Sequence, residues 1–315
     1  MPSKKLKMLG ICLALLCAVW GAILMMQVIR AKVLVDSGNW PQSFLTLSER
    51  NLIFKAVKDE PFAQVAPVLL RAVVELRPVS YAINIYGKTP WDEKRYTNRD
   101  KNYVLAEMLW STHLARPVDP AKADVLVDLL RASTRSDEKT ILSLALQNSI
   151  WTSKAVPLLI AIADDPHETL GTRSCAINTL LRHDDINRHM PMAIEIVRAH
   201  PIGGMRCQAF NWIATDGVRG NAPLSQESRD RLVSAGFEIL KAMPEKDWRG
   251  GYSTACKLGW LLHIKDEFCP NRKDPKYKLV KSGGWTDAFF TDTVRNALAW
   301  NEARGNPVVP PPSPQ

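Results

Sequence analysis

The feature that most constrains this chain is an uncharged run of twenty-two residues, Met8 to Ile29. As an α-helix rising about 1.5 Å per residue, the run would be roughly 33 Å long, and the hydrocarbon core of a bilayer is about 30 Å thick. A helix of this length and composition can cross a membrane. We therefore predict a single transmembrane anchor at residues 8–29, preceded by a short tail at residues 1–7.

A cleaved secretory signal is the main alternative to a permanent anchor. Signal sequences have an apolar stretch of about 7–15 residues that ends at a small-residue cleavage site, whereas this run is longer and Arg30 and Lys32 follow it. Lys4, Lys5 and Lys7 precede the run, which favours a cytoplasmic N-terminus. We expect an uncleaved single-pass protein with its main domain outside the cytoplasm, in the periplasm if the protein is bacterial. An adaptor of the opposite topology is the alternative.

A second pattern lies within the apolar run. Small side chains allow the backbone of another helix to approach closely. They recur on one face at Gly10, Ala14, Cys17, Ala18, Gly21 and Ala22. This face predicts a lateral contact with a partner helix or a second copy, although alanine and glycine are also common in membrane spans without such a contact.

The basic composition does not point to nucleic acid. Five basic residues flank the apolar run, which leaves +4 of the net charge of +9 for the remaining chain. The densest basic segment, RKDPKYKLVK at residues 272–281, contains only one aromatic residue, Tyr277, whereas single-strand binding surfaces interleave several aromatic rings with basic side chains. We therefore expect a membrane and a protein as partners, and no nucleic acid.

The chain beyond the anchor has the period of α-helices. Apolar residues recur at i, i+3, i+4 and i+7, and short breaks rich in proline, glycine and aspartate separate the periodic segments. A short extended piece at residues 81–86 is the one strand candidate, so the expected class is all-α. Trp40 is expected at the headgroup level as an interfacial anchor. The helices are predicted at residues 43–58, 61–76, 103–114, 120–131, 137–150, 152–163, 169–182, 191–199, 205–215, 225–243, 252–264 and 287–303.

Two of the predicted helices align with each other at a separation of thirty-three residues. Arg173 and Ala176 in the first coincide with Arg206 and Ala209 in the second, and an asparagine and an aliphatic residue follow at matching positions. The preceding helices align at a separation of thirty-four. A repeated helix pair of this size is typical of α-solenoids.

The segment AVPLLIAIADDPHETLGTRSCAINTLLR, Ala155 to Arg182, resembles the HEAT-repeat family. The resemblance lies in an apolar first helix with proline, an Asp-Asp-Pro turn, and an arginine followed by alanine in the second helix. It implies a HEAT-like α-solenoid of helix pairs in which Asp164 or Asp165 helps to hold Arg173, and Ala176 permits close helix approach. The implied repeat-stacking residues are Asp164, Asp165, Arg173, Ala176, Arg206 and Ala209.

The expected organisation follows from these patterns. The anchor is followed by juxtamembrane helices and an irregular loop at residues 30–117. The HEAT-like domain covers residues 118–304, and a proline-rich disordered tail covers residues 305–315.

Sequence motifs for catalysis or metal binding are missing. The chain contains no HExxH pair, glycine-rich phosphate loop or nucleophile elbow. The segment HDDINRH, residues 183–189, is expected at an inter-helical turn, where aspartate and histidine commonly cap helices. We therefore predict no catalytic residue, cofactor or metal. The alternative is an envelope enzyme with a site in the irregular region 78–101.

Cysteines in an extracytoplasmic domain can oxidise. Cys175 and Cys207 are expected on equivalent helices, whose axes are about 8–10 Å apart, a longer distance than the Cα separation of about 4.4–6.8 Å in disulfides. Cys256 and Cys269 are closer in sequence, so theirs is the favoured bridge. Taken together, the sequence predicts a membrane-anchored helical-repeat scaffold or accessory subunit that mediates protein–protein interaction.

Overall fold

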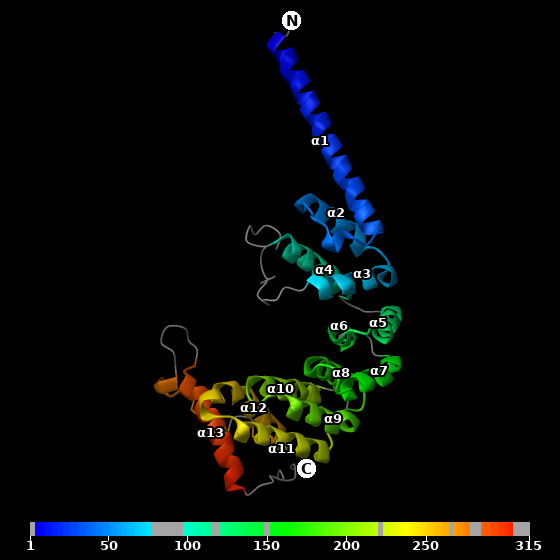
Figure 1. Ribbon diagram of the computed structural model, residues 1–315. Helices are drawn as coiled ribbons and strands as arrows, with labels where there is room; N and C mark the ends of the chain where they lie inside the picture. Colours follow the sequence, from blue (N-terminus) through cyan, green and yellow to red (C-terminus); the bar gives the residue numbers. More distant parts are fainter. Residues whose placement is uncertain are drawn as a thin grey trace. The chain divides into compact units, whose positions relative to one another are not determined.

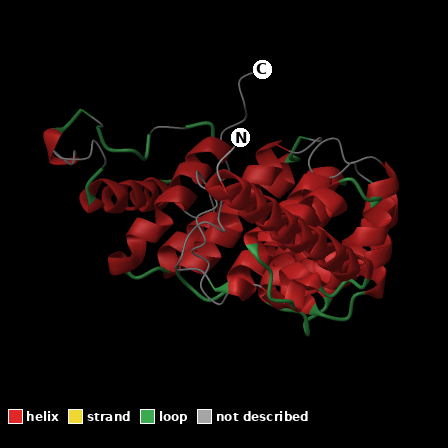
Figure 2. Cartoon of the chain, turned by 90° about the horizontal axis from the view of Figure 1, so that it is seen from above, coloured by secondary structure: helices red, strands yellow, loops and turns green. Residues whose placement is uncertain are grey.

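The computed structural model describes residues 4–76, 97–114, 120–147, 152–219, 223–264, 267–271, 273–277 and 285–304. Over these ranges the chain forms thirteen α-helices and four short 3-10 helices, with no strand (Figure 2). The predicted all-α class is therefore confirmed for the described part of the chain. The strand candidate at 81–86, nearly all of the irregular region and the proline-rich tail lie outside the described residues. The contacts divide the chain into two compact units, Met1–Leu129 (unit 1) and Leu130–Gln315 (unit 2).

Unit 1 begins with a single long helix, α1, Lys4–Asp36. Its segment Leu16–Asp36 is long and apolar enough to cross a membrane, and only 6% of its most apolar part is buried. Figure 1 shows α1 projecting from the other helices of its unit. The helix continues beyond Ile29; in this part Ala31 is only 4% exposed, and α1 packs on the elements that follow it. It ends at Asp36, and Gly38, two residues later, has a φ of +66°, the left-handed conformation that commonly follows the end of a helix.

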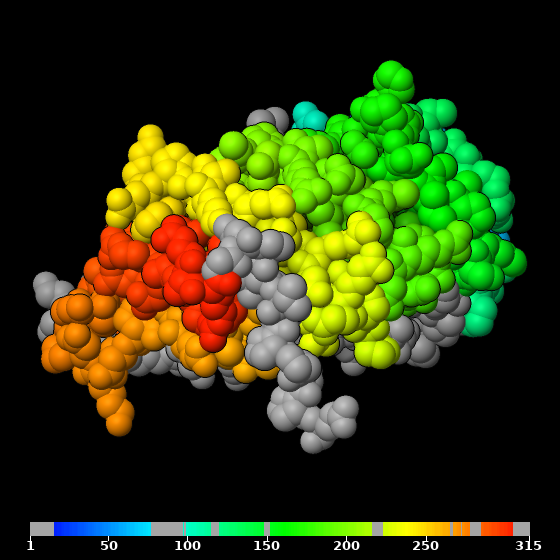
Figure 3. Space-filling model, turned by 90° about the horizontal axis from the view of Figure 1, so that it is seen from below, coloured from blue at the N-terminus to red at the C-terminus, as the bar shows by residue number. Residues whose placement is uncertain are grey.

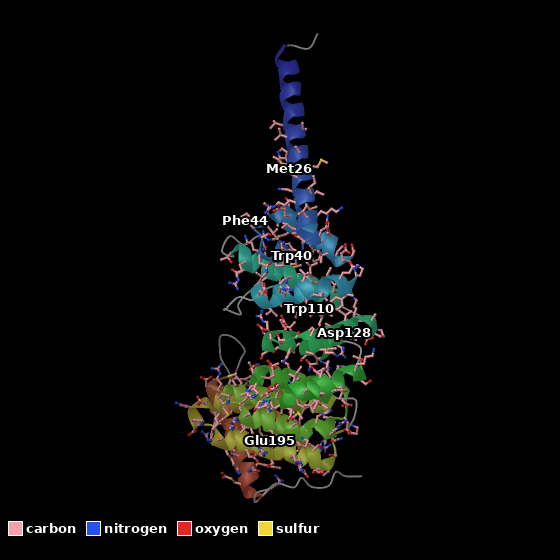
Figure 4. The ribbon with its side chains drawn as sticks, turned by 45° about the vertical axis from the view of Figure 1, so that its right-hand side comes forward. Met26, Trp40, Phe44, Trp110, Asp128 and Glu195 are labelled. Carbon is pink, nitrogen blue, oxygen red and sulfur yellow. The ribbon has the colours of Figure 1, made fainter. Side chains whose placement is uncertain are left out.

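The rest of unit 1 packs around a short turn and three helices. The elements are the 3-10 turn η1 (Trp40–Gln42), α2 (Leu47–Lys58), α3 (Phe62–Leu76) and α4 (Asn98–Leu114); α5 (Pro120–Ala132) crosses into the next unit. Helix α2 packs on α1 and α4, and α3 packs on α4. Trp40 is only 1% exposed, so the prediction that it reaches the lipid headgroups is wrong. Its ring is part of the core of unit 1 (Figure 4).

Unit 2 is built from helices α6 to α13. Their bounds are α6 Ser136–Gln147, α7 Val156–Asp164, α8 Leu170–His183, α9 Ile186–Ala199, α10 Gly204–Arg219, α11 Gln226–Ala242, α12 Trp248–Leu261 and α13 Asp287–Ala303. The 3-10 turns are η3 (Ser153–Ala155), η4 (Glu245–Asp247) and η5 (Pro275–Tyr277).

The helices of unit 2 alternate between two layers. In one layer α6 packs on α8, α8 on α10, and α10 on α12; in the other α7 packs on α9, α9 on α11, and α11 on α13. Consecutive helices from α7 to α13 connect the layers. The rows α8–α10–α12 and α9–α11 are visible in Figure 1, and Figure 3 shows α13 (red) beside the yellow helices that it contacts. Hydrogen bonds between helices of one layer join residues 32 to 43 positions apart.

Three helices of unit 2 meet closely at Gly236. A Cβ atom added there would lie 2.7 Å from Leu258 Cδ2 on α12 and 2.8 Å from Phe210 Cζ on α10. Both neighbours are fully buried. Glycine therefore permits a close approach of α11 to α10 and α12 that no larger residue would allow without displacement.

Candidate functional site

The two aligned arginines have the same local role. Arg173 Nε donates a hydrogen bond of 2.8 Å to the carbonyl of Ala163, near the C-terminal end of α7. Arg206 Nε donates one of 2.7 Å to the carbonyl of His200, and its guanidinium also bonds the carbonyl of Arg198, at the end of α9. Each arginine thus satisfies carbonyls that a helix C-terminus leaves without intrahelical partners. The two arginines, thirty-three residues apart, therefore make the same kind of contact with the end of the preceding helix.

The structure differs from the resemblance in what holds Arg173. The acceptor is a main-chain carbonyl rather than the predicted carboxylate of Asp164 or Asp165. Asp165 instead accepts a hydrogen bond of 2.8 Å from the His167 amide, and Asp164 is the last residue of α7. The two aligned alanines are both buried between helices, with Ala176 0% exposed and Ala209 4% exposed.

One stripe of α8 is covered by the neighbouring helix α6. Thr172, Cys175 and Thr179 lie at i, i+3 and i+7, and all three are buried. Thr172 Oγ1 donates to the carbonyl of Ser136 at 3.1 Å, and Thr179 Oγ1 donates to that of Ser143 at 2.9 Å. Helix α6 therefore occupies this face of α8.

The aligned stripe of α10 is exposed, and no hydrogen bond like those from α6 covers it among the described residues of unit 2. The positions that correspond to Thr172, Cys175 and Thr179 are Met205, Gln208 and Trp212. All three are exposed; Met205 retains 62% of its surface and Trp212 retains 44%. Two large apolar side chains thus face outward at positions that the preceding helix pair buries.

Helix α12 extends this exposed apolar surface. It packs beside α10 so closely that a Cβ atom on Gly250 would lie 3.9 Å from the Cα of Gly204. Trp260 of α12 is 45% exposed, and Lys257 Nζ lies 5.1 Å from the centroid of its ring. We call the exposed residues Ile202, Met205, Trp212 and Trp260 the α10–α12 surface.

The histidine and aspartate residues of unit 2 hold its turns together. Asp185 caps the start of α9 by accepting from the Asn187 amide, and His183 Nε2 contacts the carbonyl of Gln147 at 2.7 Å. His189 Nε2 lies 2.8 Å from Asp184 Oδ2. Burial raises the pKa of the Asp184 carboxyl, but hydrogen bonds from His189 and a backbone amide outweigh it and lower this pKa below its usual value. Across the described ranges, no group of three potential ligands could hold a metal ion.

One pair of buried side chains resembles part of a hydrolase site. Ser174 Oγ lies 2.9 Å from His200 Nε2, and both residues are at least 95% buried. His200 Nδ1 has no hydrogen-bond partner among the described residues, so nothing orients the ring as the third member of a triad does. Burial, followed by the charges of Arg206 and Arg173, lowers the pKa of His200. The pair therefore has the character of a buried structural hydrogen bond.

The cysteines and the small-residue face remain as separate candidates. Cys256 and Cys269 are both half-buried thiols, so the predicted bridge is not formed in this structure. On α1, Cys17, Ala18, Gly21 and Ala22 are exposed, and a Cβ atom on Gly21 would meet nothing within 4 Å. Gly10 and Ala14 belong to the same helix, but their surroundings lie outside the described residues.

Comparison with known proteins identifies no relative. No model of a protein family matches the chain, and neither a curated protein nor a solved structure matches it.

Proposed function

We propose that the protein is a membrane-anchored, HEAT-like helical-repeat scaffold or accessory subunit, and that unit 2 binds a helix of a protein partner on the α10–α12 surface. The unequal cover of the two aligned stripes carries this proposal. The face of α8 that α6 occupies corresponds to a face of α10 that exposes Met205 and Trp212. A partner helix could cover this open face of α10, as α6 covers the aligned face of α8.

The composition of the surface supports a protein partner. Tryptophan and methionine are enriched at the centres of protein interfaces, where large side chains bury much area. Two tryptophans and a methionine lie on adjacent helices here, with the ammonium group of Lys257 over one ring. Exposed apolar side chains on neighbouring helices suit the apolar face of an amphipathic helix with anchors at i, i+3, i+4 and i+7.

The solenoid architecture is part of the same proposal. Two alternating layers, arginines that cap successive helix pairs, and contacts between residues 32 to 43 positions apart are the pattern expected of stacked helical repeats. We propose that α1 is an uncleaved single-pass anchor with a cytoplasmic N-terminus and that unit 2 lies outside the cytoplasm. The small-residue face of α1 is the proposed site for contact with a membrane partner.

Site-specific photo-crosslinking in intact cells tests the partner site. The crosslinking amino acid p-benzoylphenylalanine is placed in the full-length chain at 212, at 260, or at 195 as the control. Glu195, labelled in Figure 4, is an exposed residue of α9, which belongs to the other layer. The proposal predicts one shared protein adduct at 212 and 260 that is absent at 195. Adducts of equal yield at all three positions, or none at 212 and 260, would contradict it.

Substitution of the tryptophans gives the matching affinity measurement. Since both rings are about half exposed, Trp212→Ser and Trp260→Ser should leave the fold of unit 2 intact. Truncating a central interface tryptophan typically costs about 2 kcal/mol or more, so recovery of the crosslinked partner should fall at least about tenfold. Replacing the anchor by an unrelated span then separates the two interfaces. A partner retained without the native α1 is held by unit 2, and a partner lost with it is held by the small-residue face.

A further inference from the structure

We infer that the turn leading into α2 docks unit 1 on the surface of a lipid bilayer, with Phe44 and Leu47 inserted among the headgroups. The inference rests on the proposed insertion of α1. It concerns a different surface from the α10–α12 surface and a different partner.

Phe44 and Leu47 are large apolar side chains that lie exposed on the surface of unit 1. Phe44 is 70% exposed and Leu47 is 45% exposed. Outside α1, they are the large hydrophobic residues that the described part of unit 1 leaves exposed. Because the two side chains are three residues apart at the same turn, they can contribute to one apolar patch, and contiguous apolar patches mark interaction sites.

Arg30 fixes this turn at the membrane end of the unit. Arg30 is the first charged residue after the apolar run of α1. Its guanidinium donates hydrogen bonds of 2.7 Å to Glu49 Oε1 and 2.9 Å to the carbonyl of Phe44. The turn is therefore bonded to the level at which α1 leaves the membrane.

The direction of α2 places the apolar side chains on the lipid side of this contact. Glu49 bonds to Arg30, while Val57, two turns further along α2, lines one hollow of about 330 Å³ together with Val35 and Asp36. Helix α2 therefore runs parallel to the C-terminal part of α1. Leu47, which precedes Glu49, consequently lies toward the apolar run. In Figure 4, Phe44 lies at the edge of unit 1, between the levels of Met26 on α1 and the enclosed Trp40.

Buried polar groups hold the turn in place before any lipid binds. Glu49 Oε2 accepts from the Thr46 amide at 2.8 Å, and the Thr46 hydroxyl accepts from the Glu49 amide in return, which forms a capping box at the start of α2. Asn102 Nδ2 donates to the carbonyl of Ser43 at 2.8 Å, and Arg50 Nε donates to Asn102 Oδ1. A loop that is already ordered loses little conformational entropy when its side chains insert.

The charges around the turn suit an interface with lipid headgroups. Arg30 is exposed beside the turn, and Lys32 is exposed one residue further along α1 than Ala31; both can contact anionic phosphates at this level of the helix. Arg50 is buried, and its burial lowers its pKa while the adjacent Glu49 carboxylate partly offsets this effect. Glu49 itself is 2% exposed and bonded to Arg30, so the carboxylate nearest to the turn in sequence is both buried and paired.

Photo-crosslinking to lipid tests the inference with the full-length protein. The protein is reconstituted into vesicles of phosphatidylethanolamine and phosphatidylglycerol, with p-benzoylphenylalanine at 24, 44, 47 or 111. Leu24 is an exposed residue of α1 and reports on insertion of the anchor. Ser111 is an exposed residue of α4, close to His113, which contacts the carbonyl of Val57 toward the far end of α2. Adducts are identified by the mass of a phospholipid on the labelled peptide.

The expected result is a phospholipid adduct at 24, 44 and 47, with at least a tenfold lower yield at 111. Adducts at 24 but not at 44 and 47 would overturn the docking inference and leave the anchor intact. Protein adducts at 44, in place of lipid, would also overturn it. No adduct at 24 would instead show that the proposed anchor itself does not insert.

Discussion

Replacing Gly236 with alanine tests the three-helix contact on which the architecture of unit 2 depends. Alanine in the middle of α11 would gain about 1 kcal/mol of helix propensity. Its Cβ, however, would lie 2.7 Å from Leu258 Cδ2 and 2.8 Å from Phe210 Cζ. Overpacking of a core costs about 1–3 kcal/mol, and the rigid, fully buried ring of Phe210 places this site in the upper half of that range. The expected net loss is about 1–2 kcal/mol.

Hydrogen exchange measured by mass spectrometry on the full-length protein is the appropriate assay. The chain has two units, so a single melting temperature would not report on unit 2 alone. The variant should lower the opening free energy of peptides from α10, α11 and α12 together. Gly204→Ala adds the same methyl group where nothing lies within 4 Å and should change protection by less than about 0.5 kcal/mol. Unchanged or increased protection in the Gly236 variant would refute the reasoning.

Three further predictions follow from buried groups. The pKa of His200 is lowered in the folded protein, so near pH 6.5 the unfolded chain binds a proton more readily than the folded chain, and unit 2 should lose stability as the pH falls below about 6.5. The opening free energy of unit 2 peptides, measured by hydrogen exchange between about pH 7.5 and 5.5, should depend less on pH in His200→Gln than in the unsubstituted protein. An identical pH response of the two proteins would contradict this. Cys175 and Cys207 are buried, and burial also raises the pKa of Cys207, so both should react with iodoacetamide only after denaturation. Cys256 and Cys269 are half-buried and should react in the native protein. Labelling of Cys256 and Cys269 only after reduction would instead establish a bridge between them. Arg30→Gln and Glu49→Gln, made singly and together, should show a coupling energy of about 1 kcal/mol in the opening free energy of α2 measured by hydrogen exchange. This value is low among those of contacting pairs because the Arg30 side chain is half exposed. Additive effects of the two substitutions would count against the ion pair.

Periodicity predicted most of the helices because a buried helical face must recur every three to four residues. The last helix, residues 287–303, matches the prediction at both ends. Helix α9 begins at Ile186 rather than at Pro191, because Asp185 caps the helix and the proline is accommodated as its sixth residue. The cap was present in the sequence, but the proline was interpreted as the start of the helix.

Burial was harder to predict than helix position. Trp40 follows an apolar span, where an amphipathic ring commonly lies at the interface, yet tertiary packing encloses it. Phe44, four residues later, is the exposed ring instead. Arg30 bonds to the carbonyl of Phe44 across fourteen residues and so helps to fix the backbone of this turn. No local pattern contains that contact.

The alignment of the two helix pairs identified equivalent positions but could not say which of them are covered. Arg173 and Arg206 do equivalent work because a helix C-terminus needs the same donor in both pairs. The aligned stripes of α8 and α10 differ in exposure because α6 packs over the stripe on α8. There the hydroxyls of Thr172 and Thr179 donate hydrogen bonds to carbonyls of α6. The sequence does carry a trace of this difference, since small polar residues occupy the covered stripe while methionine and tryptophan occupy the open one. Large apolar residues at positions where the aligned helix has threonine are the sequence feature on which the proposed partner surface rests.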